Sequence, residues 1–157
     1  MLCTGDALTQ ATVGETMDKD APFIAADTEV GVLAERIGRH DPAVVRRQAL
    51  LILDASGKLV GIITRDDVLR AIDKHPSGGM TVLEAGKTHL VVTYPDELVS
   101  EAAAKMLRFD IGRLPVVERG DERSVVGYLG RGAILSARLR RFQDEHVIER
   151  GWRAVSK

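Results

Sequence analysis

The sequence predicts a mixed α/β fold of the α+β type, in which two copies of a β-α-β-β-α unit pack sheet to sheet as one pseudo-symmetric module. Three observations support this prediction. The chain has 157 residues, enough for one domain or for two small ones that share a core. Apolar runs of strand length alternate with segments whose apolar residues recur at helical spacing. The order of these segments occurs twice, and a repeat of this kind decides the architecture.

Composition excludes several other classes of protein. The chain is 45% hydrophobic and 29% charged, so it has apolar surface to bury and is not disordered throughout. A formal net charge of −1 gives no field that would attract nucleic acid. The longest apolar runs, such as 49–53, are far shorter than the roughly 20 residues of a membrane span. Because the single cysteine, Cys3, cannot form an intramolecular disulfide, we expect a cytoplasmic protein in a reducing compartment.

Each copy contains the same elements in the same order. The first copy has a strand at 23–26, a helix from 27, strands at 50–54 and 59–63, and a helix from 66. The second has a strand at 90–93, a helix from 96, strands at 114–118 and 125–129, and a helix from 131. Asp27 and Asp96 occupy the position where an aspartate commonly caps a helix, so we expect both to be N-caps. Polar turns at 54–57 and 118–121 join the paired strands.

The two copies should form one module. A single unit of this size would leave one face of its sheet bare, so the sheets are expected to pack against each other. We expect domains at 13–74 and 80–140, and a helical tail at 141–157 whose mixed charges recur at helical spacing. The segment 73–79, which contains Pro76 and two glycines, is the expected crossing between the copies.

One motif in the first copy carries chemistry. Gly61, Thr64 and Asp67 follow one another at three-residue spacing where a strand passes into a helix. Glycine lets a flat ligand approach the backbone, and a carboxylate can accept hydrogen bonds from both hydroxyls of a ribose. The alternative is purely structural, because Thr64 and Asp67 also have the spacing of a helix-capping arrangement.

The second copy bears on that choice. Gly130 and Ala133 stand at the positions that match Thr64 and Asp67. If the pair served only the fold, its loss should cost the second helix roughly 1 kcal/mol. Retention in one copy and loss in the other therefore favours one competent and one degenerate ligand site, although glycine could also serve as a poorer cap.

These residues resemble a known family. The stretches 61–69 (GIITRDDVL) and 114–117 (LPVV) are similar to those of a tandem pair of CBS (cystathionine-β-synthase) domains, a Bateman module, and the resemblance runs from about 13 to 139. It implies a regulatory rather than catalytic module that forms homodimers and binds an adenine nucleotide (AMP, ADP or ATP) between its copies. It implies no metal, and the sequence offers no catalytic constellation.

The resemblance also implies which residues hold the nucleotide. The implied ligand-binding residues are Gly61, Ile62, Ile63, Thr64, Asp67, Thr88, His89, Leu90, Arg113 and Arg131. Asp67 would bond the ribose, Arg113 and Arg131 the phosphates, and residues 88–90 the adenine through backbone groups. The isoleucines would form apolar walls. A lone arginine such as Arg113 is otherwise most often a solvated surface cation, which is the alternative for that residue.

A module of two copies has a second, equivalent cleft between them, and we expect this cleft to be empty. Ala49 stands at the position that matches Arg113, and Leu51 stands where the second copy has Pro115. The second cleft thus lacks the ribose carboxylate, the threonine and the phosphate arginine together. We expect one adenine nucleotide per chain.

A narrower resemblance suggests a partner. The insertion at 41–50 and the tail at 137–146 are similar to the cytosolic module of prokaryotic ClC-type chloride channel proteins. This implies a module that regulates an attached or partner membrane transport domain from the cytosolic face of the membrane. Two alternatives stay open: a structural dimerisation module with vestigial sites, and a stand-alone cytosolic adenylate sensor.

Overall fold

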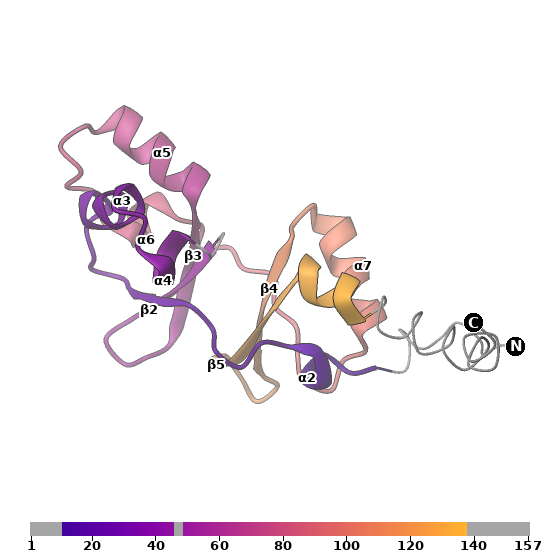
Figure 1. The fold of residues 1–157 in the computed structure, drawn as a ribbon. Helices are drawn as coiled ribbons and strands as arrows, with labels where there is room; N and C mark the ends of the chain where they lie inside the picture. The colour runs from indigo at the N-terminus through magenta and orange to yellow at the C-terminus, as the bar shows by residue number, and fades with distance from the viewer. Residues whose placement is uncertain (1–10, 46–48, 138–157) are drawn as a thin grey trace, which may run out of the picture.

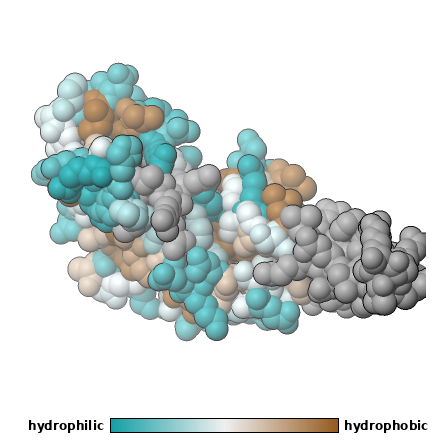
Figure 2. All heavy atoms as spheres, viewed as in Figure 1, coloured by the Kyte–Doolittle hydropathy of each residue, from teal (hydrophilic) through white to brown (hydrophobic). Residues whose placement is uncertain are grey.

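The computed structural model describes residues 11–45 and 49–137, which form two lobes (Figure 1). The first lobe comprises residues 21–87 and contains a three-stranded sheet. The second lobe comprises residues 11–18 and 88–137 and contains a two-stranded sheet. Cys3 and the tail predicted at 141–157 lie outside the described residues. Figure 2 shows the two lobes with polar side chains over much of their visible surface.

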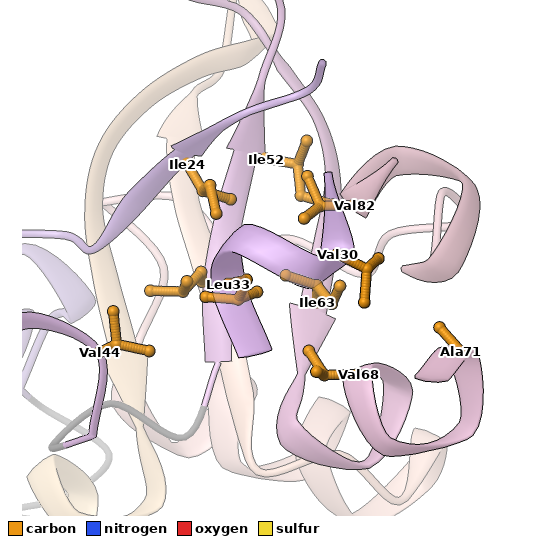
Figure 3. Close-up of a cluster of buried hydrophobic side chains, with 10 residues drawn as sticks. Ile24, Val30, Leu33, Val44, Ile52, Ile63, Val68, Ala71 and Val82 are labelled. Atoms are coloured by element: carbon orange, nitrogen blue, oxygen red, sulfur yellow. The ribbon is translucent and has the colours of Figure 1, made fainter. Parts of the chain in front are cut away.

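The first lobe follows the predicted order of elements. Its strands are β1 (Phe23–Ala25), β2 (Ala49–Leu53) and β3 (Leu59–Thr64), and its longer helices are α3 (Val30–Gly38) and α5 (Arg65–Lys74). The strand β1 pairs with β2 in parallel, and β2 pairs with β3 as an antiparallel hairpin. A short helix, α4 (Pro42–Val45), lies in the predicted insertion and places Val44 in the core. The apolar face of α3 packs with α5 on this sheet, as Figure 3 shows for Leu33, Val68 and their neighbours.

The second lobe has the helix α7 (Val99–Phe109), the strands β4 (Arg113–Glu118) and β5 (Asp121–Gly130), and a helical segment at 131–137. The strand predicted at 90–93 is wrong as a full strand, because only Thr93 pairs with β4, at Val116. Prolines explain this shortening. A strand that continued before Thr93 would need an N–H donor at Pro115. A strand that continued after Thr93 would need one at Pro95, but proline has no N–H. At the matching positions of the first lobe, the N–H groups of Leu51 and Ala26 do donate to strand neighbours.

Two short helices exchange places between the lobes. Helix α2 (Val13–Thr16) begins the first copy in sequence but packs on the second lobe, while α6 (Val82–Ala85) begins the second copy and packs on the first. The N–H of Val13 donates to the carbonyl of Glu97 and that of Val82 to Thr28, both at 2.8 Å. Each lobe is therefore completed by a segment from the other copy.

This exchange corrects the predicted crossing at 73–79. Gly78 lies against Gly31 of the first lobe, and its carbonyl accepts a hydrogen bond from the Gly31 N–H at 2.9 Å. The chain stays with the first lobe as far as Lys87, whose backbone pairs with Ile62 of β3. It crosses to the second lobe only after Lys87.

The exchange also corrects both predicted N-caps. Helix α3 begins after Glu29 and α7 after Leu98, so neither Asp27 nor Asp96 is the N-cap. Backbone carbonyls of the exchanged segments satisfy the first helical N–H groups instead: Val30 donates to Met80 at 2.7 Å and Val99 to Ala11 at 2.8 Å. A side-chain cap is unnecessary where a neighbouring chain segment supplies the acceptor.

The two sheets pack face to face, as the repeat predicts. One cluster of buried side chains draws on both lobes: Ala21, Leu51, Leu59, Val117 and Tyr128. Each lobe also has a core of its own between its sheet and its helices. Within the described ranges, no helix is both long enough and apolar enough to cross a membrane.

Candidate functional site

The predicted Thr64–Asp67 pair lies where β3 passes into α5. Thr64 is the N-cap, and its hydroxyl accepts a hydrogen bond from the Asp67 N–H at 3.3 Å. The carboxylate of Asp67 in turn accepts from the Thr64 N–H at 3.0 Å. This is the reciprocal capping arrangement that the spacing also allowed, so the pair has a structural role. A carboxylate has lone pairs beyond those the cap uses, which leaves a ligand role open to Asp67.

Asp67 is a buried acidic residue with 3% of its surface exposed. Its second oxygen, Oδ1, lies 2.5 Å from Nη2 of Arg70, one helical turn further along α5. A buried charge needs partners of this kind, and Asp67 obtains them from the helix start and from Arg70. The sequence interpretation did not include Arg70, although a cation three residues after a carboxylate on a helix is a recognisable signal.

The three predicted residues of β3 have other partners. A side chain at Gly61 would place its Cβ 2.9 Å from the carbonyl oxygen of Lys87, so the absence of a side chain admits the exchanged segment. Ile63 is 1% exposed and belongs to the core of the first lobe (Figure 3). Ile62 is half-buried and borders the cluster between the sheets. Of the two isoleucines, Ile62 alone keeps accessible surface for a ligand.

Residues 88–90 follow directly on this pairing. Lys87 pairs with Ile62 in an antiparallel bridge, with N–H to carbonyl distances of 2.8 and 2.9 Å. Thr88 and His89 are exposed, and Leu90 is half-buried at the edge of the cluster between the sheets. The structure thus brings this segment beside β3, and its contact with an adenine stays a prediction.

The two predicted phosphate arginines meet at one end of the second sheet. Arg113 pairs with Gly130 in the β4–β5 register, and the N–H of Arg131 donates to the Gly112 carbonyl at 3.0 Å. The Arg131 guanidinium lies over Gly112, where a Cβ would be 3.3 Å from Cζ and Nε. Thr64 occupies the matching place in the first sheet, paired with Ala49. Thr64 on the first lobe and Arg113 with Arg131 on the second therefore lie at equivalent ends of their sheets, whereas Gly61 and Ile63 face protein neighbours.

Ion pairs join the lobes at the opposite, hairpin ends of the sheets. Lys58 of the first hairpin bonds Asp121 of the second, and Nη2 of Arg123 lies 3.1 Å from Oδ2 of Asp54. A hydrogen bond from the Lys58 backbone N–H lowers the pKa of Asp54, and the Lys58 ammonium lowers the pKa of Asp121. Sequence analysis missed these pairs because no local spacing marks contacts between hairpin turns so distant in the chain.

The second lobe has a buried carboxylate in a different place. Glu97 accepts hydrogen bonds from the Thr93 hydroxyl at 2.8 Å and from the Lys105 ammonium at 2.7 Å. Burial opposes ionisation of Glu97, but the bonds from Lys105 and Thr93 outweigh it and hold its pKa below the ordinary value. These bonds, and one from the Tyr94 N–H at 3.2 Å, all go to Oε1 of Glu97, which stands two residues before α7 begins. Among the described residues, no group of histidine, cysteine and acidic side chains has the arrangement of a metal site.

Comparison with known proteins agrees with this architecture. The CBS domain family matches the chain over residues 13–74 and 83–140. The chain therefore belongs to the CBS domain family, and its two copies form a tandem CBS domain pair.

Solved structures of CBS domain pairs are similar to this chain. The pair of protein MJ0100, in complex with 5′-methylthioadenosine and S-adenosyl-L-methionine, is 27% identical with a TM-score of 0.67. That match covers 86% of this chain and 98% of the other. CBSX2 in complex with AMP is 24% identical with a TM-score of 0.67, over 83% of this chain and 97% of the other. At 24% identity, the similarity to CBSX2 shows the fold alone.

A curated relative is a much longer enzyme. L-aspartate semialdehyde sulfurtransferase of Methanocaldococcus jannaschii is 38% identical over 78 residues, which is 50% of this chain. The match spans 14% of that enzyme's length, so the likeness concerns a part of it.

Proposed function

We propose that this CBS domain pair is a regulatory, non-catalytic module that binds one adenine nucleotide per chain between its lobes. The observation that carries the proposal is the buried carboxylate of Asp67 at the start of α5, where the second copy has Ala133. The similarity to a CBS domain pair in complex with two adenosine compounds supports an adenosine-containing ligand.

Two pairs of residues, one pair on each lobe, suit the two ends of such a ligand. Asp67 supplies acceptors for the ribose hydroxyls, and Thr64 adds a hydroxyl beside it. Arg113 and Arg131 lie together on the other lobe, and guanidinium groups make charge-assisted, bidentate bonds to phosphate oxygens. A nucleotide held by both lobes favours the arrangement of lobes that it fits. It can shift that equilibrium only by its difference in affinity for the two arrangements.

Calorimetric titration with AMP, ADP and ATP tests the proposal. We expect a stoichiometry of one per chain. Asp67→Ala should weaken binding about tenfold to a hundredfold, because a hydrogen bond to a charged group contributes about 1.5–3 kcal/mol. The matched control is Asp66→Ala, which removes an exposed carboxylate from the neighbouring position of the same helix turn and should leave affinity unchanged. Equal affinities for Asp67→Ala and the parent chain, with both folded, would reject the ribose assignment.

We further propose that nucleotide occupancy regulates a membrane transport domain, and we name a ClC-type chloride channel as the partner. The support is the similarity of the 41–50 insertion to the cytosolic module of such proteins. Chloride flux into membrane vesicles that contain the transporter should depend on AMP when this chain is present. The dependence should be lost with Asp67→Ala, and flux that ignores both would contradict this partner. A stand-alone cytosolic sensor would bind AMP with the same Asp67 dependence and leave the flux unchanged.

One observation also favours a homodimer. A module that only dimerises, without binding a nucleotide, is the structural alternative. Leu69 of α5 and Leu135 of the 131–137 helix occupy equivalent positions in the two copies and are 67% and 59% exposed. We propose that a second copy covers them. Leu69→Glu with Leu135→Glu should give monomers by analytical ultracentrifugation, while Leu107→Glu on α7 should not. If no nucleotide at millimolar concentration raises the melting temperature of the dimer, the structural alternative holds, because a ligand at 100 times Kd stabilises by about 2.7 kcal/mol.

A further inference from the structure

Arg70 covers the carboxylate of Asp67. The two residues lie three positions apart on α5 and so on one face of the helix. Nη2 of Arg70 is 2.5 Å from Oδ1 of Asp67. The Arg70 side chain is 63% exposed and that of Asp67 is 2% exposed, so the guanidinium lies on the solvent side of the carboxylate. A ligand that approaches Asp67 from solvent meets Arg70 first.

The two oxygens of Asp67 differ in how easily their partners can leave. Oδ2 accepts from the Thr64 backbone N–H at 3.0 Å, inside the capping arrangement that begins α5. That bond cannot be given up without disturbing the start of the helix. Oδ1 is held by Arg70, whose long side chain is mostly in water and can turn away. Oδ1 is therefore the oxygen that a ligand can gain.

We propose that Arg70 competes with the ribose hydroxyls for Oδ1 of Asp67 and thereby sets the affinity and the ribose selectivity of the site. This inference rests on the proposed function, since it concerns the same carboxylate. The competing ion pair has one exposed partner, and pairs of that kind are weak. Because a ribose must displace Arg70 from Asp67, the ion pair should lower the affinity for a ribose by a factor of about two to five. The pair also keeps the buried carboxylate partnered when no nucleotide is bound.

The competition can be isolated by changing the protein and the ligand together. Calorimetry would use AMP and 2′,3′-dideoxy-AMP, which has the same base and phosphate but no ribose hydroxyls. Arg70→Gln should bind AMP about two to five times more tightly than the parent chain and bind the dideoxy compound equally. Lys74→Gln is the matched control, because it removes one positive charge from the exposed end of the same helix. It should change neither affinity. Arg70→Lys retains the charge and should bind AMP with an affinity between those of Arg70→Gln and the parent chain.

The remaining outcomes separate the two proposals. If Arg70→Gln binds AMP equally or more weakly while Asp67→Ala still weakens binding, the competition is overturned and the proposed function stands. If Arg70→Gln binds both ligands more tightly by the same factor, Arg70 acts through its charge and the competition is again overturned. If neither the parent chain nor Arg70→Gln binds AMP, both proposals fail. Thermal unfolding of each variant shows that it is folded.

Discussion

The two copies share the backbone bonds that dock their exchanged segments and differ in their polar side chains. Ile62 pairs with Lys87 in the first lobe, and Tyr128 pairs with Asp18 in the second, at matching positions of the repeat. Gly61 and Gly127 are equivalent, and each faces the segment exchanged from the other copy. The N–H to carbonyl bonds that dock these segments are therefore repeated, although the side chains around them are not.

The two copies differ in where they place a buried carboxylate. The first copy keeps Asp67 at the start of α5, with one partner that is mostly in solvent. The second copy has Ala133 there and keeps Glu97 instead, enclosed by Thr93 and Lys105. The two carboxylates differ in their cationic partners: the Arg70 side chain, which bonds Asp67, is 63% exposed, whereas the Lys105 side chain, which bonds Glu97, is 28% exposed. The fold thus repeats the bonds that dock the exchanged segments, whereas, among the described residues, a carboxylate at the start of the second helix occurs only in the first copy.

The largest expected effect concerns these two carboxylates. Glu97→Gln should lower the free energy of unfolding by about 1.5–3 kcal/mol, because Lys105 loses a charged partner in a buried place. Asp67→Asn should cost less, because Arg70 can turn to water. Urea denaturation of both variants measures the difference. Equal losses would contradict the distinction between a carboxylate with a mostly exposed cationic partner and one with a half-buried partner.

The equivalent glycines give the next contrast. A Cβ at Gly61 would lie 2.9 Å from the Lys87 carbonyl oxygen, which is backbone, so Gly61→Ala should destabilise by about 1–3 kcal/mol. At Gly127 the nearest atom would be Sδ of Met17, a flexible side chain that can move aside, and the nearest backbone atom, the Asp18 carbonyl oxygen, would be 3.2 Å away. Gly127→Ala should therefore cost clearly less in urea denaturation. If Gly61→Ala instead leaves stability unchanged and weakens AMP binding, the glycine serves the ligand.

The two helix starts give a smaller effect. Thr64→Ala should destabilise by about 0.5–2 kcal/mol, whereas Thr64→Gly, which copies Gly130, should cost only a few tenths. Chemical denaturation of the two variants decides whether glycine is an adequate cap here. A small loss for Thr64→Gly would mean that capping alone does not account for the threonine, which sharpens the argument for a ligand. A loss as large as that of Thr64→Ala would favour the structural explanation of the motif.

The smallest effect should appear in acid, at the hairpin ends that join the lobes. The pKa values of Asp54 and Asp121 are lowered from 3.8 in the folded chain. Their contribution to stability is therefore present above that value and is lost as the pH falls through the lowered pKa values. Asp121→Asn should be slightly less stable than the parent chain at neutral pH, and the difference should shrink below about pH 4. A difference that persists in strong acid would show that the carboxylate charge does not stabilise this contact.

Much of the fold was predictable because it depends on local patterns. Apolar runs and turn residues predicted β2, β3, β4 and half of β5, and the three-residue spacing allowed, as an alternative, the capping arrangement with which α5 begins. The incorrect N-caps have a clear cause. Asp27 and Asp96 have the right residue type, but carbonyls from remote segments already satisfy the helical N–H groups.

For the candidate site, the sequence proposed residues that could bind a ligand but not the protein groups that contact them. Asp67 and Thr64 are marked by spacing, and Arg113 and Arg131 by the resemblance to CBS domain pairs. Ile63 could not be assigned to the core from the sequence, because alternation alone does not say which sheet face is enclosed. The exposure of Arg70 and the approach of Lys87 to Gly61 also had to come from the structure.

By itself, the sequence determined that two similar units exist, where most of their strands and helices lie, and that only the first has the threonine and carboxylate at the start of its second helix. These features are encoded within a few neighbouring residues, by hydrophobic period, turn chemistry and side-chain type. The tertiary structure decided that α2 and α6 exchange lobes, that the lobes are joined at their hairpin ends, and that Arg70 covers Asp67. Those features depend on which distant or solvent-facing groups come within bonding distance, and that is settled only when the chain is packed.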